Sequence, residues 1–582
     1  MAYFLRQDKR KNGIYLQMYE NYWDKSKRQA RSKWIESFGY INDLVSDEIP
    51  DPVAYYKEYV RQKELERKSF VDDTTRPRIS NETPEKNAGH FLIHSLIDLL
   101  EVKEVIDILS TVHRYQFSVY DMLNALICAR IIEPRSKSKT VSNVLPLLMN
   151  SPTLSEDQVY DGCFFIGENY EKYIELFNHQ YEKLFTRKFD KVYFDCTNYY
   201  FEIDFPADDK QKGPSKENKK EPIIGQALLL DSELVPVAMK MYPGNESEKP
   251  YIRSMIEDMK SRYKVSGRTV QVADKGLNCA RNIYAAVKEA NDGYIFSKSI
   301  HGTGLGSAEK QWLLLEDNKE NKYTNYYDKD GNIKYRIKSC VDTFEYKFKE
   351  IDSESEKETI KSFSVKEKRV VSFNPSLCAK QKTEILKQAE KASNYATYKQ
   401  MTREELGDAV KYISIENKDK NGAKINPKVK LNREKLEEDL KYAGYNLLVT
   451  SEINMTPEQI YEAYHGLWKI EESFRITKSF LDARPVYLQK KESIYGHFLI
   501  CYLSLFLLRV LEIKFFNGKL SANEIIRFIR DFRIVKKDDA TYINISRDRE
   551  VILKMKEATG ISTLDALFLS EKEVHNLFNT IL

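Results

Sequence analysis

The spacing of hydrophobic and polar residues changes several times along this chain, and each change marks a boundary between predicted elements. The first 45 residues hold three short alternating runs, YFLRQ, GIYLQMYENY and SKWIESFGYI, separated by basic turns, which predicts a small β structure. Residues 46–86 are polar and predict a helix followed by a linker. Residues 87–188 carry apolar stripes at helical spacing, as in HFLIHSLIDLLEV, and predict a helical domain.

The pattern changes from helical to strand-like at residue 190. Three β-rich runs come first, KVYFDCTNYYFEI, IIGQALLLD and LVPVAMKMY, and a helix, a strand, a helix and a strand follow them up to residue 300. This is the order of elements in a ribonuclease-H-like α/β sheet. An α/β core is therefore predicted to begin here.

The α/β pattern is interrupted after residue 300. Residues 301–443 are polar, rich in turns and strands at first and helical later, which indicates an inserted domain. The α/β pattern resumes at YNLLVTSE, and a long helix is then predicted from Thr456 to about Leu481. Pro457 occupies the first position of this helix, and Gln459 completes a capping box with Thr456.

These segments predict an α/β multidomain protein in which a ribonuclease-H-like core is interrupted by a β-rich insertion and preceded by a small β module and a helical domain. A chain of 582 residues is several times the usual domain size, so several domains are expected. The predicted parts are a basic β-hairpin module with its linker (1–86), the helical domain (87–188), the first part of the core (189–300), the insertion domain (301–443), the second part of the core with the helix from Thr456 (444–517), and a helical C-terminal tail (518–582).

The charge of the whole chain is nearly balanced, with 92 Lys and Arg against 88 Asp and Glu, so net charge alone does not indicate a nucleic-acid partner. Residues 1–40 differ, because nine basic residues there face four acidic ones and alternate with aromatic residues. This segment is either a solvated hairpin surface or a module that contacts DNA.

Several other classes of protein are disfavoured by the sequence. The seven cysteines are scattered without a CxxC pair, which argues for reduced thiols and against a zinc module or a disulfide scaffold. The N-terminus lacks the apolar core of a signal peptide, and the most apolar run, Phe498 to Leu508, is too short to cross a bilayer. No Walker-type phosphate loop is present, so no nucleotide cofactor is expected. A soluble, intracellular protein is expected.

Two aspartates stand where predicted strands end. Asp195 lies in VYFDCT, where apolar Val192 and Phe194 alternate with Tyr193, and this places Asp195 near the end of a half-buried strand. Asp274 lies in VQVADKG, where a β-run ends at the aspartate and a glycine follows two residues later. Because acids are depleted in strand interiors, these positions predict two carboxylates at one edge of a sheet, where ligands bind in open α/β folds.

A third acid lies on the helix that begins at Thr456. Tyr464, Glu471 and Lys478 are spaced by seven residues, and at about 3.6 residues per turn they form one stripe along the helix. A helix packed in a core would carry Leu or Ile at such positions. A phenol, a carboxylate and an ammonium group instead suit a face that handles phosphate.

Cleavage of a phosphodiester needs these residue types. A nucleophile must be activated and an alkoxide leaving group stabilised, and two Mg²⁺ ions about 3.5–4 Å apart do both. Mg²⁺ prefers oxygen ligands and keeps part of its water, so a few carboxylates from separate elements are sufficient. Each acid alone would be interpreted as a surface charge or a helix cap. The three together favour a metal site at Asp195, Asp274 and Glu471.

The chain resembles bacterial insertion-sequence DDE transposases that carry a Tyr-Arg-Glu-Lys signature. The resemblance lies in FDCT, in ADKG, and in the spacing of Tyr464, Leu467, Glu471 and Lys478. Further similar runs are GPSK at 213–216, MYPGNESE at 241–248, IEESFRITKS followed by RPVY within 470–487, and the basic segment 129–137. The resemblance spans nearly the whole chain.

This resemblance implies a ribonuclease-H-like catalytic core and assigns Asp195, Asp274 and Glu471 as ligands of Mg²⁺, for which Mn²⁺ would substitute. It also implies that Tyr464 and Lys478 contact phosphates. The implied partners are double-stranded DNA, both as terminal inverted repeats and as target, and a second copy of the chain when DNA is bound. The basic N-terminal region and the helical domain would recognise the inverted repeats.

The chain departs from the signature at one position, because Leu467 stands where the signature has Arg. Arg475 lies about 40° from Glu471 around the same helix and is the candidate to supply the missing cation. Pairing of Arg475 with Glu471 or Glu472 along the helix is the alternative.

Two further residues are candidate DNA contacts. Lys216, in a polar loop, either touches DNA or belongs to a solvated loop. Trp312, in AEKQWLLLE, either stacks on an unpaired base or packs into the core of the insertion domain.

The expected function is that of a DNA transposase that binds element ends, cleaves phosphodiester bonds with two divalent metal ions and joins the 3′ ends to target DNA. Two alternatives stay open. One is a standalone ribonuclease-H-like nuclease that cuts DNA without joining it, and the other is a transposase-derived DNA-binding protein that has lost catalysis. The three acids argue against the last, whereas Leu467 leaves it open. The expected location is the bacterial cytoplasm, in association with DNA.

Overall fold

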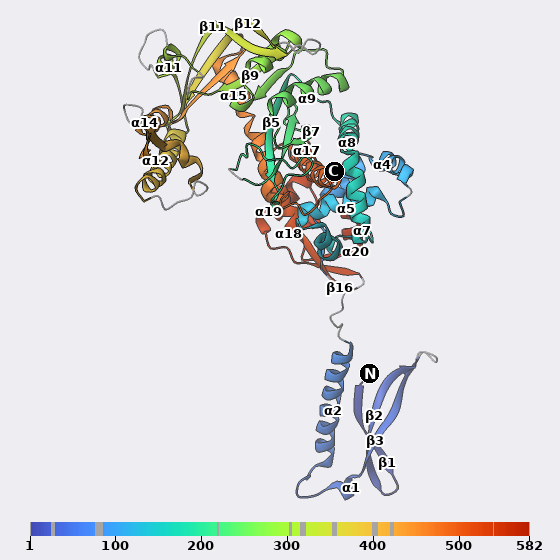
Figure 1. The fold of residues 1–582 in the computed structure, drawn as a ribbon. Coiled ribbons are helices and arrows are strands. Elements are labelled where there is room, and N and C mark those ends of the chain that lie inside the picture. The colour runs from blue at the N-terminus through green and yellow to red at the C-terminus, as the bar shows by residue number, and fades with distance from the viewer. Residues whose placement is uncertain are drawn as a thin grey trace. The chain divides into compact units, whose positions relative to one another are not determined.

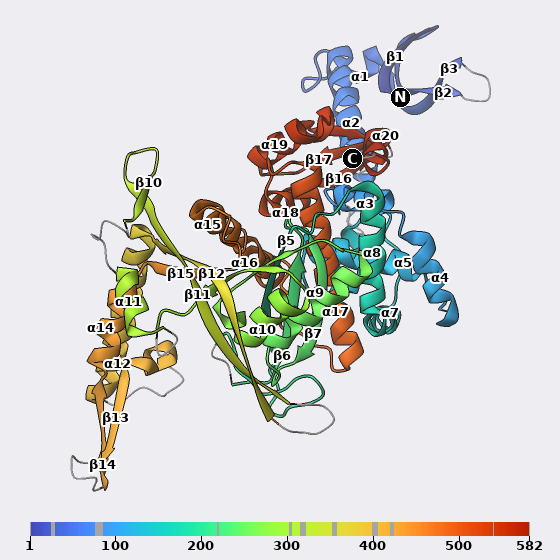
Figure 2. The ribbon, with the colours of Figure 1, turned by 90° about the horizontal axis from the view of Figure 1, so that it is seen from above.

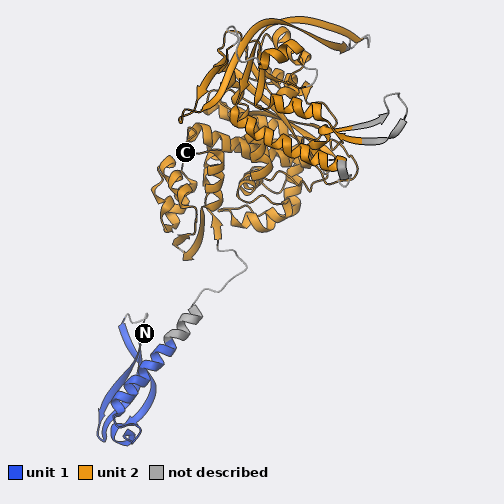
Figure 3. Cartoon of the chain, turned by 90° about the vertical axis from the view of Figure 1, so that its left-hand side faces the viewer, with its two compact units in different colours: residues 1–83 blue, residues 84–582 orange. Residues whose placement is uncertain are grey.

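The computed structural model describes residues 2–24, 29–75, 85–113, 115–217, 220–301, 305–314, 322–351, 358–398, 406–418, 424–538 and 540–580. These residues form two compact units, residues 1–83 and residues 84–582 (Figure 3). Within these ranges every helix is too short or too polar to cross a lipid bilayer.

The first unit is a three-stranded antiparallel sheet with one long helix against it. Its elements are β1 (Ala2–Arg10), β2 (Gly13–Asp24), β3 (Gln29–Tyr40), α1 (Ile41–Leu44) and α2 (Pro52–Thr75). The strand order is β1-β2-β3, and the three strands predicted for residues 1–45 are confirmed. Leu16 and Val60 are buried between the sheet and α2, and the ring of Phe38 stacks on that of Tyr56 at 4.3 Å.

The helical part of the second unit surrounds one apolar helix, α17 (Lys491–Val510), whose residues from Ser493 to Val510 are all buried. The helices around it include α5 and α7, and Figures 1 and 2 show this group on one side of the large sheet. The predicted helical character of residues 87–188 is confirmed. The helices are α3 (Phe91–Leu99), α4 (Lys103–Ser110), α5 (Val119–Ile132), α6 (Lys137–Lys139), α7 (Glu156–Glu168) and α8 (Tyr170–Leu184).

A nine-stranded mixed sheet forms the centre of the second unit, with the strand order β10-β11-β12-β15-β9-β8-β5-β6-β7. Strand β8 runs parallel to its neighbours β5 and β9, and the other pairs are antiparallel. The predicted order of strands and helices from residue 190 is confirmed. The elements are β5 (Lys191–Tyr200), β6 (Ile223–Leu230), β7 (Pro236–Pro243), α9 (Lys249–Arg262), β8 (Val270–Ala273), α10 (Ala280–Tyr284) and β9 (Gly293–Lys298).

Alternation along the strands separates the core into two clusters, one on each face of the sheet. On β5, Tyr193 and Tyr199 pack in the cluster that contains α17, whereas Val192 and Phe194 pack in the cluster that contains α9. Because successive side chains of a strand point to opposite faces, Asp195 is on the same face as Tyr193, toward α17. The sheet is therefore covered by helices on both faces, as in α/β proteins.

Residues 301–443 make two different contributions. Their first half extends the central sheet with three strands, and their second half forms a small lobe with its own core around Ala392 and Tyr412. In Figures 1 and 2 the lobe helices α12 and α14 lie far from α17. The elements are α11 (Ser307–Leu314), β10 (Thr324–Tyr327), β11 (Ile333–Ile351), β12 (Glu358–Phe373), α12 (Pro375–Tyr398), β13 (Ile413–Lys418), β14 (Lys424–Leu431), α14 (Arg433–Tyr442) and β15 (Tyr445–Thr450).

The C-terminal segment is not purely helical, which corrects the prediction for residues 518–582. Its strands join β4 in a four-stranded sheet of order β18-β17-β16-β4, with Arg533 paired to Asn87. Such short strands leave almost no alternation for a sequence pattern to reveal. The elements are β4 (Glu85–Asn87), α18 (Ala522–Asp531), β16 (Arg533–Asp538), β17 (Thr541–Asn544), α19 (Arg549–Thr559), β18 (Phe568–Ser570) and α20 (Glu571–Phe578).

The helix predicted from Thr456 to about Leu481 is divided. It consists of α15 (Pro457–His465), α16 (Trp468–Arg475) and one π-helical turn (Ile476–Phe480), and its predicted capping box is confirmed. The division falls at Gly466, where a Cβ atom would lie 2.7 Å from the hydroxyl oxygen of Tyr193 on β5. The missing side chain thus lets the helix approach the sheet.

A glycine contact between α7 and α17 generates a stability prediction. A Cβ atom at Gly496 would lie 2.0 Å from the carbonyl oxygen of Cys163, so the two helices touch through their backbones. Gly496→Ala is expected to destabilise the protein by about 1–3 kcal/mol or more, because overpacking a core forces backbone shifts. Thermal unfolding measures this effect, and Gly267→Ala, which has open space around its Cβ position, serves as the control. Equal unfolding temperatures for the two variants would contradict the contact.

Candidate active site

Two aspartates lie side by side where the parallel pairing of β5 and β8 ends. The last paired step is Phe194 with Ala273, so Asp195 and Asp274 occupy the next position on each chain. Neighbouring strands are about 4.8 Å apart, and equivalent positions of parallel strands point to the same face. Asp274 directly follows its strand, as predicted. The prediction that Asp195 lies near the end of its strand is wrong, because β5 continues to Tyr200. Asp195 lies instead at the point where the parallel pairing with β8 ends.

The helix pair α15–α16 brings two members of the predicted stripe to these aspartates. The hydroxyl of Tyr464 donates a hydrogen bond to Oδ1 of Asp274 at 3.0 Å. Glu471 lies on α16, and burial together with the negative charge of Asp274 raises its pKa. The pKa of Tyr464 is raised by burial and by the same aspartate. Tyr464 and Glu471 therefore both interact with Asp274.

Asp195 is in a strongly perturbed electrostatic environment. Burial, and to a smaller extent the negative charges of Asp274 and Glu248, raise its pKa to about 6, although Lys216 and the Cys196 backbone N–H oppose the shift. The N–H of Cys196 donates to Oδ1 of Asp195 at 2.7 Å. Carboxylates that repel one another in this way gain from a nearby cation, because it favours their charged forms.

Lys216 supplies one such cation. Its Nζ lies 3.6 Å from Oδ1 of Asp195 and 3.2 Å from Oε2 of Glu248, and it also donates to the carbonyl oxygen of Cys196. Burial opposes its charge, but the two carboxylates raise its pKa above the usual value. Glu248 was missed by the sequence reasoning. Its signal lay in the sequence, because it ends the MYPGNESE run.

Lys478, the third member of the stripe, has a different partner. Its Nζ lies 2.9 Å from Oε1 of Glu217, whose other oxygen pairs with Arg484. Burial raises the pKa of Glu217, but the two cations lower it more strongly, and the net shift is downward. Burial lowers the pKa of Lys478 against the opposing effect of Glu217. The charge of Lys478 is therefore balanced within the protein.

Leu467, which stands where the signature has Arg, and Arg475, the candidate to replace that cation, lie in contrasting environments. Leu467 is buried in the core cluster that contains α17, at 4% exposure. Arg475 is on the outer side of α16, with 64% of its side chain exposed, and its Nη2 lies 3.7 Å from Oε1 of Glu472. Leu467 thus packs the helix, and Arg475 pairs along it.

A buried ion-pair network holds α16 in place, and sequence reasoning missed it. Arg509 on α17 is fully buried, and its Nη1 lies 2.9 Å from Glu472 and 2.5 Å from Glu512. Its other nitrogens donate to Ser473 Oγ and to the carbonyl oxygen of Lys469 on α16. Glu472 follows Glu471 directly, so this network fixes the segment that carries the candidate acid.

Trp312 lies on α11, away from the aspartates in the fold. Its half-buried ring packs against the core cluster that contains α9, and the ammonium group of Lys338 lies 5.0 Å from the ring centre. These contacts favour the interpretation of Trp312 as a packing residue, with the ammonium group of Lys338 near its ring.

A cleft of about 450 Å³ opens beside Asp274 and Tyr464 and extends to the helical lobe of the insertion. Lys275, Lys298 and Lys411 contribute ammonium groups to its lining. The cleft therefore joins Asp274 at the sheet to a lobe surface of mixed charge, to which Glu384, Asp408, Asp439 and Lys411 contribute.

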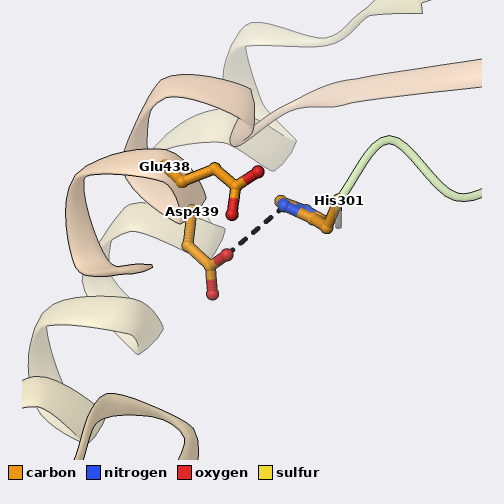
Figure 4. Close-up of side chains that lie close together, drawn as sticks. All are labelled: His301, Glu438 and Asp439. Carbon is orange, nitrogen blue, oxygen red and sulfur yellow. Dashed lines mark ion pairs between the residues drawn. The ribbon is translucent and has the colours of Figure 1, made fainter. Parts of the chain in front are cut away.

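His301, Glu438 and Asp439 form a second cluster of possible metal ligands at this cleft, and their ligand atoms lie within 4.8 Å of one another (Figure 4). Nδ1 of His301 lies 3.3 Å from Oδ1 of Asp439. The carboxylates are already paired, because Lys435 lies 3.0 Å from Glu438 and 2.9 Å from Asp439, and Lys310 lies 3.2 Å from Glu438. Lys411 also lies 3.3 Å from Asp439, and with three ammonium groups in contact this cluster is a poor fit for a metal ion.

Across the described ranges of the chain, that cluster is the one group of three such side chains packed so closely. The ligand atoms of Asp195, Asp274 and Glu471 are more widely spread. Each aspartate is held by a neighbour, Asp195 by Lys216 and Asp274 by Tyr464. The three carboxylates nevertheless offer the oxygen ligands that hard divalent cations prefer.

Comparison with known proteins gives one family. The model of the transposase DDE domain matches residues 200–507, a range that contains Asp274 and Glu471 and begins five residues after Asp195. A search of curated proteins finds no match. Among solved structures, a cryo-EM structure of a piggyBac transposase synaptic complex with hairpin DNA is similar at a TM-score of 0.36 and 9% sequence identity, over 84% of each chain.

The buried network under α16 generates a prediction. Arg509→Leu is expected to lower the free energy of unfolding by about 3 kcal/mol, because it removes the fully buried cation between Glu472 and Glu512, although Lys469 stays in contact with both carboxylates. Denaturant unfolding measures the loss. Arg475→Leu is the matched control on the same helix and is expected to leave stability nearly unchanged, because that side chain is largely exposed. A small effect at Arg509 would show that the network does not hold α16.

Proposed function

The chain belongs to the family of transposases with a DDE domain, which are enzymes of DNA transposition, and we propose on this basis that Asp195, Asp274 and Glu471 form its DNA-cleaving site. In this proposal the protein binds the ends of a DNA element, cleaves phosphodiester bonds there and joins the freed 3′ ends to target DNA. The observation that carries the assignment is the register of β5 and β8. It sets two aspartates side by side, next to the helix of Glu471.

The three carboxylates fit a pair of divalent cations by their chemistry, and Mg²⁺, with Mn²⁺ as a substitute, is the proposed cofactor. When bound, such ions activate the attacking water or hydroxyl and stabilise the leaving alkoxide. Asp195 and Asp274 would hold them from the sheet and Glu471 from α16. The raised pKa values of Asp195 and Glu471 support the fit, because burial, and to a smaller extent the charge of Asp274, disfavours their charged forms and a bound cation would favour them.

The cations around this site are proposed to hold the phosphates of the substrate. Lys478 and Arg484 share Glu217, so DNA phosphate would replace that carboxylate as their partner. Lys216 would exchange Asp195 for phosphate when the metal ions bind. Tyr464 would orient Asp274. Arg475, which is exposed, is proposed to reach the DNA backbone in place of the signature Arg.

Within this family, we propose that the chain is a bacterial insertion-sequence transposase of the Tyr-Arg-Glu-Lys type with a ribonuclease-H-like core. The sheet order around β5, β8 and β9 and the helix of Glu471 support this core. The insertion between β9 and β15 supports an interrupted version of it. The proposed partners are terminal inverted repeats and target DNA, and a second copy of the chain when DNA is bound.

The assignment of the acids is tested by removing charge while keeping size. Asp195→Asn, Asp274→Asn and Glu471→Gln are each expected to reduce cleavage of a plasmid that carries the gene with its own flanks by roughly a hundredfold or more, because metal ions contribute several kcal/mol to such reactions. DNA binding is expected to persist. EDTA should abolish cleavage, and Mg²⁺ or Mn²⁺ should restore it.

Asp258→Asn, at an exposed position of α9, is the matched control and should cut normally. Full activity in any of the three variants would remove that residue from the site. Cleavage without joining of ends in the wild-type protein would favour the nuclease alternative.

The first unit is proposed to contact DNA through the basic residues of segment 25–31. Charge reversal at Lys25, Lys27, Arg28 and Arg31 is expected to weaken DNA binding and to flatten its dependence on salt. The log–log slope should fall by about 0.9 for each phosphate that the protein no longer touches. The first three of these residues lie outside the described residues. Electrophoretic mobility shifts at several salt concentrations measure the slope.

The control reverses the charges of Lys57 and Arg61, which are exposed on α2 in the same unit. If charge reversal in segment 25–31 left the salt dependence of DNA binding unchanged, as in this control, that segment would be excluded as a DNA surface.

A further inference from the structure

A basic cavity of about 280 Å³ lies between the loop that follows α5 and the loop that precedes α17. We propose that it binds a phosphate group of the DNA backbone; this inference rests on the proposed function and adds a contact outside the carboxylate site. The cavity brings together residues of two sequence runs, RIIEPRSKSK at 130–139 and ARPVY at 483–487.

Lys137 is the central group of this cavity. It is 94% buried, since only 6% of its surface is exposed, and its Nζ lies 3.4 Å from Nδ1 of His497. Nε2 of His497 lies 2.9 Å from the carbonyl oxygen of Ala483, which can only accept, so Nε2 carries the proton and Nδ1 accepts from Lys137. Among the residues that the structure describes, no carboxylate pairs with Lys137. An ammonium group has three donors, and two of them remain for a ligand.

Burial makes such a cation costly without an anion. It lowers the pKa of Lys137 to about 8, with Arg130 acting in the same direction and the thiol of Cys163 against it. Burial also lowers the pKa of His497 well below its usual value, so the imidazole is neutral and offers no charge. A phosphate in the cavity would restore the charged form of Lys137 and supply the missing acceptors.

Most of the other charged residues that line the cavity are also cations. Arg130 is buried and donates to the carbonyl oxygens of Arg135 and Leu481, at 3.1 Å and 3.4 Å, which ties the two loops together. Arg135 and Lys139 are exposed at the rim. Among the described residues that line the cavity, Asp482 is the single acid, against four cations.

The rim favours a nucleic acid as the source of the phosphate. The side chains of Tyr487 and Tyr160 line the cavity with exposures of 73% and 38%. Exposed aromatic rings beside a cationic groove suit the sugars and bases that adjoin a backbone phosphate. Arg484, directly before Pro485, pairs with the same Glu217 that binds Lys478. One segment of the chain therefore connects the candidate active site with this cavity, and a DNA strand could contact both.

The test measures binding of a fluorescent DNA duplex to the full-length protein without divalent metal, over a series of salt concentrations. Lys137→Met and Lys139→Gln are each expected to weaken binding by about three- to tenfold near 0.1 M salt and to lower the salt slope by about one. The loss should be equal for duplexes of different sequence, because phosphate contacts carry no base information. Lys556→Gln, on an exposed lysine of α19 paired with Asp565, is the control.

Thermal unfolding with inorganic phosphate as a second probe separates the sources of the anion and checks folding. Phosphate is expected to raise the unfolding temperature of the wild type more than that of Lys137→Met. If phosphate stabilises the wild type while both variants bind DNA normally, the cavity takes a free phosphate and the DNA assignment is wrong. If neither probe distinguishes the variants from the control, the cavity is not an anion site. Normal DNA cleavage in that case would leave the proposed function intact. If the wild type failed to bind DNA, the proposed function would be rejected. Stabilisation by phosphate would then still test whether the cavity binds an anion.

Discussion

The parallel register of β5 and β8 is the constraint on which the candidate active site depends. Its last step pairs Phe194 with Ala273, and the two aspartates follow at equivalent positions. Strand alternation then directs both toward the face covered by α15, α16 and α17. A shift of one residue in this register would turn one carboxylate to the opposite face. The helices on the two faces, which bury alternate residues of the same strands, fix that register.

Six charged groups around this register are paired within the protein itself. Lys216 compensates Asp195 and Glu248, and Glu217 compensates Lys478 and Arg484. These pairs place cations and carboxylates at one surface and give each of the six groups a partner of opposite charge. A divalent metal ion offers the carboxylates a partner with twice the charge of an ammonium group, and a DNA phosphate, a monoanion like a carboxylate, offers the cations an equivalent partner. Binding would then be an exchange of partners rather than the burial of new charge.

Much of this organisation could be predicted from local patterns. The order of strands and helices from residue 190, the capping box at Thr456 and the apolar helix α17 all leave periodic or short-range signals. The run KVYFDCTNYYFEI predicted a strand on both sides of Asp195, but it did not show that pairing with β8 ends beside this residue while pairing with β6 continues. The division of the Glu471 helix was equally hidden. It depends on the ring of Tyr193 beneath Gly466, more than 250 residues earlier in the sequence.

The sequence by itself determined the identities of Asp195, Asp274 and Glu471 and the elements that carry them, because strands and helix faces are set by residues a few positions away. Only the tertiary structure decided which side chains meet. It paired Lys216 with Asp195 and Arg509 with Glu472, and it placed the hydroxyl of Tyr464 in hydrogen-bond contact with Asp274. It also joined β4 to β16 and brought Lys137 to His497. These partners lie from tens to hundreds of residues apart in the sequence, and their pairing depends on packing and charge balance over the whole core, which no local pattern encodes.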